Sequence, residues 1–281
     1  KSGKPLIPRA AGTSLAGQVV GDGTVLDTGR HMNAMLHINV EERWAEVQPG
    51  VVRDELNHYL KEYGLFFGPN TSTSNRSMMG GMVGNNSSGS TSISYGTTSE
   101  KLLGLELVTA DGVLRAMGDI QSDGVREIPS AVEDWMTLWS EAWSAQNLES
   151  HFPDASIHRR NTGYAIDLIV NDTDALLQVM CGSEGTLGIT TKIRVALDFL
   201  PPAHVAVAAL HYHSIDKAMG ATPKLMAFGP YQLELMDRII LECTRESKEY
   251  GSYRDFVQGD PAAILLVEID GESEAELAEK L

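Results

Sequence analysis

The stretch PRAAGTSLAG, residues 8–17, is the part of the sequence from which the rest can be interpreted. It follows the apolar pair Leu6-Ile7, which predicts a strand, and it holds one charged residue, no aromatic residue and the run Gly12-Thr13-Ser14. A strand that runs into such small residues presents consecutive backbone N–H groups, a geometry that binds anions. No acidic residue occurs in residues 1–21, although the chain carries a net charge of −16. The stretch therefore predicts a phosphate-binding loop, with an ordinary tight turn as the alternative.

Two common phosphate motifs are absent from the sequence. There is no G-x-x-x-x-G-K-[ST] run, and Gly17, Gly21 and Gly23 do not form a G-x-G-x-x-G that opens a helix. Two further glycine runs occur instead, at residues 80–86 and 182–189. Because glycine allows a ligand to approach the backbone closely, three such runs predict a long cofactor held across a sheet mainly by main chain.

The hydrophobic pattern predicts alternating strands and helices around these runs. Before Pro201-Pro202, we expect strands at 6–7, 24–27, 37–40, 44–48, 104–109 and 190–197, and helices at 53–63, 131–147 and 168–180. After it, we expect strands at 205–210, 231–235 and 264–269, and helices at 215–221, 236–246 and 273–281.

Two segments leave alternatives open. Residues 69–96 are mostly Gly, Ser, Thr and Asn, which is also typical of a linker, but their spaced apolar residues favour an ordered loop that wraps a ligand. Trp135, Trp139 and Trp143 recur every four residues and share one face of the predicted helix. We interpret them as a buried stripe or a subunit contact rather than a ligand cage.

Composition excludes several classes of protein. The net charge of −16 argues against nucleic acid or an anionic membrane as the main partner, because both bind basic surfaces. No run reaches the roughly 18 apolar residues of a transmembrane helix. The two cysteines form no C-x-x-C and no H-E-x-x-H occurs, so we predict neither a disulfide framework nor a metal site. We expect a cytoplasmic protein, with peripheral attachment to the inner membrane as the alternative.

Taken together, the motifs resemble the FAD-binding domain of the vanillyl-alcohol oxidase and para-cresol methylhydroxylase (PCMH) superfamily, and within it the FAD-linked D-2-hydroxyacid dehydrogenases. The resemblance rests on residues 8–17, 47–51, 80–89, 95–96 and 182–189, in this order and approximate spacing. Residues 234–238 resemble the start of the family's C-terminal FAD-linked oxidase domain. Residues 159–164 resemble long bacterial members in which flavin and iron–sulfur modules share one polypeptide.

This resemblance implies an α+β fold in two domains. Residues 1–200 would form a PCMH-type FAD-binding domain of two subdomains, and residues 203–281 would form part of a ferredoxin-like α+β cap domain that carries substrate contacts. We expect the chain to be a fragment, because the family's first strand–helix unit would precede residue 1 and the end of the cap would follow residue 281.

The resemblance also implies the residues that hold FAD. The backbone N–H groups that would bind the pyrophosphate belong to Ala11, Gly12, Thr13, Ser14 and Leu15. The residues that would line the flavin and the ribityl chain are Gly80, Gly81, Asn85, Ser87 and Gly89, with Pro69 and Thr71 nearby. Those that would pack on the other side of the cofactor are Gly185, Gly188 and Ile189. Some members bond FAD to a histidine at about the position of Thr13, and since threonine cannot form that bond, we expect non-covalent FAD.

The implied reaction is hydride transfer from a D-2-hydroxy acid, such as D-lactate, glycolate or D-2-hydroxyglutarate, to flavin N5. The electrons would pass to a quinone, a cytochrome, an electron-transfer flavoprotein or an iron–sulfur module. Arg160 is the candidate for binding the substrate carboxylate, since arginine forms bidentate pairs with carboxylates. No catalytic base is assigned. The alternatives are a non-catalytic FAD-fold module for binding or assembly, and a flavoenzyme of the same fold acting on an alcohol or a sugar.

Overall fold

The computed structural model of the chain describes residues 3–127, 129–144, 151–154, 156–157, 163–169 and 175–280. It divides into two compact units, the first formed by residues 1–89 and 97–199 and the second by residues 90–96 and 200–281. The predicted FAD-binding domain, residues 1–200, includes residues 90–96, but in the structure these residues group with the second unit. There the Ser94 hydroxyl donates to the carbonyl of Tyr231 at 2.9 Å, and the rings of Tyr95 and Tyr231 meet edge to face.

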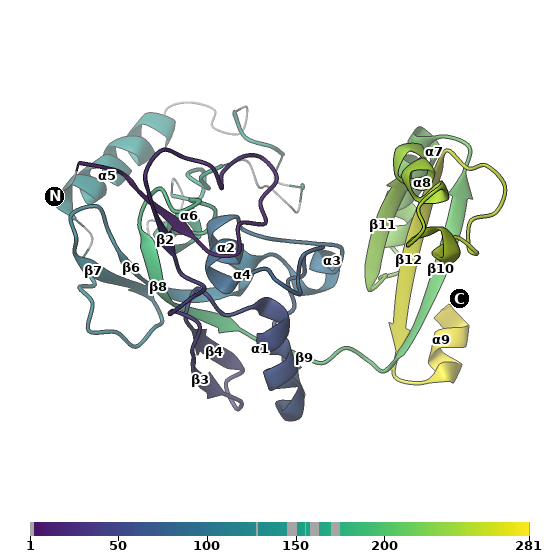
Figure 1. Ribbon diagram of the computed structural model, residues 1–281, viewed down its shortest axis with the longest axis horizontal. Coiled ribbons are helices and arrows are strands. Elements are labelled where there is room, and N and C mark those ends of the chain that lie inside the picture. Colours follow the sequence, from purple (N-terminus) through teal and green to yellow (C-terminus); the bar gives the residue numbers. More distant parts are fainter. Residues whose placement is uncertain are drawn as a thin grey trace. The chain divides into compact units, whose positions relative to one another are not determined.

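The framework of the first unit is a five-stranded sheet of order β3-β4-β8-β6-β7, in which every neighbouring pair is antiparallel (Figure 1). Its strands are β3 (Met35–Asn39), β4 (Trp44–Val47), β6 (Leu102–Val108), β7 (Leu114–Gly118) and β8 (Ile189–Ala196). Two small sheets accompany it: β1 (Leu6–Arg9) parallel to β2 (Thr24–Asp27), and β5 (Leu65–Phe66) antiparallel to β9 (Asp198–Phe199). The strand predicted at the start of the chain thus belongs to its own small sheet.

The described helices of this unit are α1 (Arg53–Leu60) with the 3₁₀ turn η1 (Lys61–Tyr63), α2 (Met79–Gly84), α4 (Thr98–Lys101), α5 (Ser130–Ser144) and α6 (Leu176–Met180). The helical segment ends at Gly64, as predicted, because Gly64 takes a φ of 70°. Segment 69–96 is ordered and contains α2 and α3 (Ser92–Tyr95). None of the helices in the described ranges combines the length and the hydropathy that crossing a lipid bilayer requires.

The helix predicted over residues 168–180 is wrong at its start. Residues 166–169 form a turn, and the described helix begins at Leu176; residues 170–174 lie outside the described part. The physical reason is a competing set of hydrogen bonds. The Ser140 hydroxyl donates to the carbonyl of Ile169 at 3.4 Å, a carbonyl that a helix over residues 168–180 would use internally. The Trp139 indole holds the same turn by donating to the carbonyl of Ile166 at 3.1 Å.

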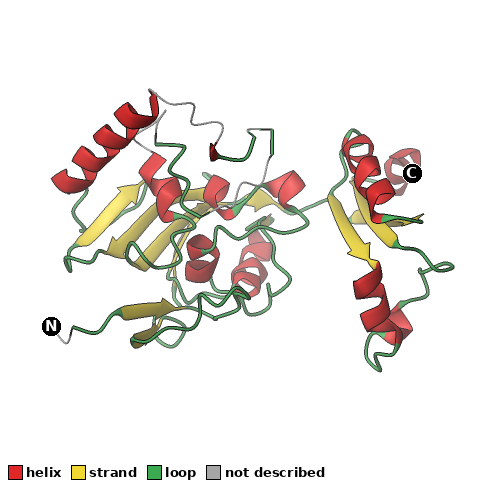
Figure 2. Cartoon of the chain, turned by 90° about the horizontal axis from the view of Figure 1, so that it is seen from above, coloured by secondary structure: helices red, strands yellow, loops and turns green. Residues whose placement is uncertain are grey.

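The five-stranded sheet has one apolar and one polar face, because side chains alternate along each strand. Ala45 and Val47 of β4 belong to the main core together with residues of α1 and α2, whereas Glu46 lies on the opposite face with Arg194 of β8. Figure 2 shows the helices stacked beside the sheet. Within α5, Trp139 packs on a second cluster with Met136, while Trp135 remains 42% exposed, so the tryptophan stripe is only partly buried.

The second unit is a three-stranded antiparallel sheet of order β10-β12-β11. Its elements after residue 200 are, in chain order, β10 (His204–Tyr212), α7 (Ile215–Met226), β11 (Gln232–Asp237), α8 (Arg238–Arg245), η4 (Gly251–Tyr253), β12 (Ala263–Gly271) and α9 (Glu274–Lys280). The helix predicted from residue 236 begins two residues later because the Asp237 carboxylate accepts from the N–H of Ile240 at 3.0 Å and caps α8. Helix α7 continues past its predicted end and includes Pro223.

Candidate functional site

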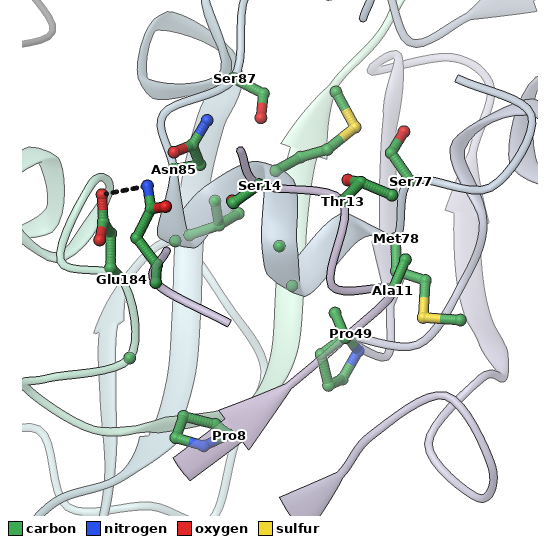
Figure 3. A pocket seen from close by; sticks show the side chains of 18 of the residues that line it. Pro8, Ala11, Thr13, Ser14, Pro49, Ser77, Met78, Asn85, Ser87 and Glu184 are labelled. Atoms are coloured by element: carbon green, nitrogen blue, oxygen red, sulfur yellow. Dashed lines mark hydrogen bonds between the residues drawn. The ribbon is translucent and has the colours of Figure 1, made fainter. Parts of the chain in front are cut away.

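A cavity of about 340 Å³ lies in the first unit where the three glycine-bearing segments meet (Figure 3). Gly12 comes from the loop after β1, Gly81 from α2, and Gly185 from the loop before β8, and all three line it. Its volume is within the roughly 300–1,000 Å³ of ligand pockets. The segments predicted to surround one ligand therefore converge on one cavity.

The loop after β1 supplies the donors. Gly12 takes a φ of 65°, which turns the backbone beneath the cavity. Within the described ranges, the N–H groups of residues 11–14 donate to no protein acceptor. The side chains of Thr13 and Ser14 line the same cavity and add hydroxyl donors. Four neutral N–H groups on a concave backbone form a site for an anion such as a phosphate.

The second wall is the start of α2 and the segment that leads into it. A Cβ on Gly80 would lie 2.5 Å from the Cβ of Pro49, so only glycine lets α2 approach the end of β4 this closely. The hydroxyls of Thr71, Thr73 and Ser77 cluster on the cavity wall, with Thr71 3.4 Å from Thr73 and 3.3 Å from Ser77. This wall combines hydroxyl groups with the apolar side chains of the helix.

The loop before β8 forms the third wall. The N–H of Gly182 donates to the carbonyl of Val83 and that of Glu184 to the carbonyl of Gly84, each at 2.8 Å, so the loop is fastened to the end of α2. Gly185 has a φ of 76°, and a Cβ there would lie 2.4 Å from the Cγ of Pro8 in β1. The glycine thus brings this loop against the strand that leads into residues 11–14.

Most of the residues predicted to bind FAD line this one cavity. Those are Ala11, Gly12, Thr13, Ser14, Thr71, Gly80, Gly81, Asn85, Ser87, Gly185 and Gly188. Outside the lining are Leu15, Pro69, Gly89 and Ile189. Leu15 is fully exposed, and the carbonyl of Pro69 accepts from Arg53 at 3.1 Å, which is a structural contact. Arg160, the candidate for the substrate carboxylate, lies outside the described residues.

Among the polar lining side chains that sequence reasoning did not assign to the site, three are long: Arg9, Gln18 and Glu184. Arg9 donates to the carbonyl of Val19, while its Nε, like Gln18 Oε1, is buried without a hydrogen-bond partner among the described residues. Arg9 and Glu184 are the ionisable side chains of the described lining. Arg9 and Glu184 stand inside two of the quoted motifs, but motif position alone does not say which side chains turn inward.

A thiol nucleophile does not belong to this site. Cys181 precedes the third glycine segment, but burial raises the pKa of its thiol to about 12, so the group stays protonated at neutral pH.

The cavity fits an extended dinucleotide. It offers free N–H groups for a pyrophosphate, and hydroxyls and buried unpartnered polar atoms for the sugar and other polar groups of the ligand. Apolar side chains such as Met78 and Leu105 suit a ring system.

Comparison with known proteins identifies the ligand. Residues 1–118 match the family described as FAD binding domain, and residues 201–281 match the C-terminal domain of FAD linked oxidases. The chain belongs to the FAD-linked oxidase family. Its cofactor is FAD.

The curated relatives that this chain matches include D-2-hydroxyglutarate dehydrogenases and a glycolate oxidase subunit. The chain is 35% identical to a D-2-hydroxyglutarate dehydrogenase of Pseudomonas putida over 98% of its length and 28% of the relative. The corresponding enzyme of Pantoea ananatis is 33% identical over 90% of the chain and 25% of the relative. The glycolate oxidase subunit GlcD of Bacillus subtilis is 28% identical over 95% of the chain and 46% of the subunit. The chain thus spans about a quarter of the length of these D-2-hydroxyglutarate dehydrogenases.

A solved structure has the same fold. An alkyldihydroxyacetonephosphate synthase superposes with a TM-score of 0.63 at 18% identity, over 98% of this chain and 44% of the other. This likeness supports the predicted α+β fold, and the two family matches identify its parts as a PCMH-type FAD-binding domain followed by an oxidase C-terminal domain.

Proposed function

We propose that the protein carrying this chain is an FAD-dependent dehydrogenase of D-2-hydroxy acids, with D-2-hydroxyglutarate as its first candidate substrate. The observation that carries the proposal is the cavity in which free N–H groups of residues 11–14 face two further glycine-bearing walls. The similarity to D-2-hydroxyglutarate dehydrogenases over nearly the whole chain supports the substrate class.

The role of the described residues is to hold and orient the cofactor. The N–H groups of Ala11, Gly12, Thr13 and Ser14 would bind the pyrophosphate, and α2 with the loop before β8 would enclose the rest from opposite sides. When bound, FAD supplies the acceptor for the hydride, which carries both electrons away from the hydroxyl-bearing carbon of the substrate. Main-chain donors suit this task because they are preorganised and keep no charge of their own.

The proposal is tested with the full-length protein. Purified protein is expected to show flavin absorption bands, and to reduce a dye acceptor with D-2-hydroxyglutarate but not with its L enantiomer. D-lactate and glycolate, assayed in parallel, rank the substrate class. Bound flavin without turnover of any 2-hydroxy acid would favour the non-catalytic binding module. Turnover of an alcohol or a sugar alone would favour a flavoenzyme of the same fold with a different substrate. Absence of flavin, with no uptake from added FAD, would contradict the proposal itself.

FAD is expected to be bound without a covalent link. Thr13 lines the cavity and has no nucleophilic nitrogen to attack the flavin, and histidine is absent from the described lining. Acid precipitation of the holoenzyme is therefore expected to release all flavin into the supernatant, and the denatured polypeptide is expected to show no flavin fluorescence on a gel. Flavin that stays with the precipitated chain would contradict this prediction.

A further inference from the structure

The cavity holds a pair of polar side chains to which the proposed function gives no role. Gln18 follows the phosphate-binding loop and Glu184 lies in the loop before β8. The Gln18 Nε2 donates to Glu184 Oε1 at 3.2 Å, the bond drawn as a dashed line in Figure 3. A carboxylate is only an acceptor, so this bond fixes the orientation of the Gln18 amide. The Gln18 Oε1 must then point elsewhere, and it is buried without a donor among the described residues.

Glu184 is held in an unusual backbone conformation. Its φ is 53°, a region that residues other than glycine rarely adopt, and its N–H is fastened to the carbonyl of Gly84 at 2.8 Å. Such conformations concentrate at ligand-binding positions, where surrounding contacts enforce them. Glycine would relieve the conformation, so the backbone by itself does not account for a glutamate at this position.

The chemistry of the pair excludes the phosphates of FAD and favours its neutral donors. Glu184 is the acid of the described lining, and a phosphate beside it would be repelled. In Figure 3, Glu184 lies with Asn85 on one side of α2, whereas Thr13 and Ser77 lie on the other side. A carboxylate oxygen and an amide oxygen are acceptors for neutral donors, and hydroxyl groups are the donors that FAD carries on its ribose and on its ribityl chain.

We propose that Gln18 Oε1 and the Glu184 carboxylate form a subsite for sugar hydroxyls of FAD. This inference rests on the proposed function, because it takes FAD as the ligand of the cavity. Adjacent hydroxyls of the ribose or of the ribityl chain would donate to the two acceptors. The Gln18–Glu184 bond keeps those acceptors together and ties the loop after β1 to the loop before β8.

The test measures ligand affinity of the full-length apoprotein by calorimetry, with FAD, FMN and ADP as probes. Two variants remove the acceptors, Gln18→Leu and Glu184→Gly, and Glu41→Gln, an exposed carboxylate outside the cavity, is the matched control. Each of the two variants is expected to weaken FAD binding about tenfold or more, the usual effect of losing hydrogen bonds to a charged or buried acceptor. The control is expected to bind FAD like the wild type.

The three probes separate the two sources of hydroxyls. Weaker binding of FAD and ADP with unchanged FMN assigns the subsite to the adenosine half, where the ribose carries the hydroxyls. Weaker binding of FAD and FMN with unchanged ADP assigns it to the riboflavin half, where the ribityl chain carries them. The apoprotein melting temperature of Glu184→Gly is expected to stay at or above that of the wild type, since glycine accepts a positive φ. An unchanged melting temperature would show that the weaker FAD binding of this variant does not come from a less stable fold.

Two results would overturn the subsite. One is wild-type FAD affinity in both variants, and the other is an equal loss for all three probes, which would mean a general collapse of the cavity. Either result leaves wild-type FAD binding intact and so leaves the proposed function standing. A wild-type protein that binds no FAD would overturn both.

Discussion

Replacing Gly185 by alanine is expected to destabilise the first unit by about 2–5 kcal/mol and to weaken FAD binding at least tenfold. Two costs add. A φ of 76° costs an L residue about 1–2 kcal/mol. A Cβ 2.4 Å from the Cγ of Pro8 forces a shift that costs about 1–3 kcal/mol more. Since Pro8 leads into residues 11–14, that shift moves the N–H groups that would bind the pyrophosphate.

The matched control is Gly112→Ala. Gly112 has a φ of 80°, close to that of Gly185, but nothing lies within 4 Å of its Cβ position and it is outside the cavity. It is expected to lose only the conformational part of the stability and to bind FAD like the wild type. Urea unfolding followed by tryptophan fluorescence and titration of the apoprotein with FAD measure both effects. Because all four tryptophans belong to the first unit, the fluorescence reports that unit. Equal effects of the two substitutions would contradict the role given to the Gly185–Pro8 contact.

Replacing Arg194 by methionine is expected to destabilise the first unit by about 3–5 kcal/mol, the usual cost of leaving a buried charge unpaired. Arg194 Nη2 lies 2.9 Å from Glu46 Oε1 and Nη1 lies 2.8 Å from Asp119 Oδ2, and the two side chains of the first pair are 5% and 6% exposed. The guanidinium also covers the Trp44 ring, 3.9 Å from its centroid. Its removal leaves the Glu46 carboxylate buried on the polar face of the sheet.

A second variant tests that explanation. In Arg194→Met combined with Glu46→Leu, no unpaired buried charge remains, because Asp119 is exposed, so a large part of the lost stability is expected to return. Arg76→Met is the control for loss of an arginine alone: Arg76 is exposed, and the change is expected to stay within about 0.5 kcal/mol. Urea unfolding of the three variants followed by tryptophan fluorescence makes the comparison. If the double variant is no more stable than the single one, the unpaired carboxylate is not the cause.

Local sequence patterns were enough to predict most of the elements and the segments that meet at the site. Alternating side chains in β4 and β8, a stop signal at Gly64 and bare glycine runs in three places are local properties, and each predicts its element without knowledge of the rest. The glycine runs also predicted one cavity, because glycine where the chain must approach a ligand closely is a local requirement.

Which side chains enter the cavity, and where some elements begin, depends on contacts between segments that are far apart in the sequence. Leu15 stands in the most informative motif and is fully exposed, whereas Gln18, outside every motif, joins Glu184 across 166 positions. The turn at residues 166–169 likewise depends on Trp139 and Ser140, which a local pattern cannot place beside it. The physical reason is common to these cases: a hydrogen bond between distant segments is made or lost by the packing of the whole unit, and short-range periodicity carries no information about it.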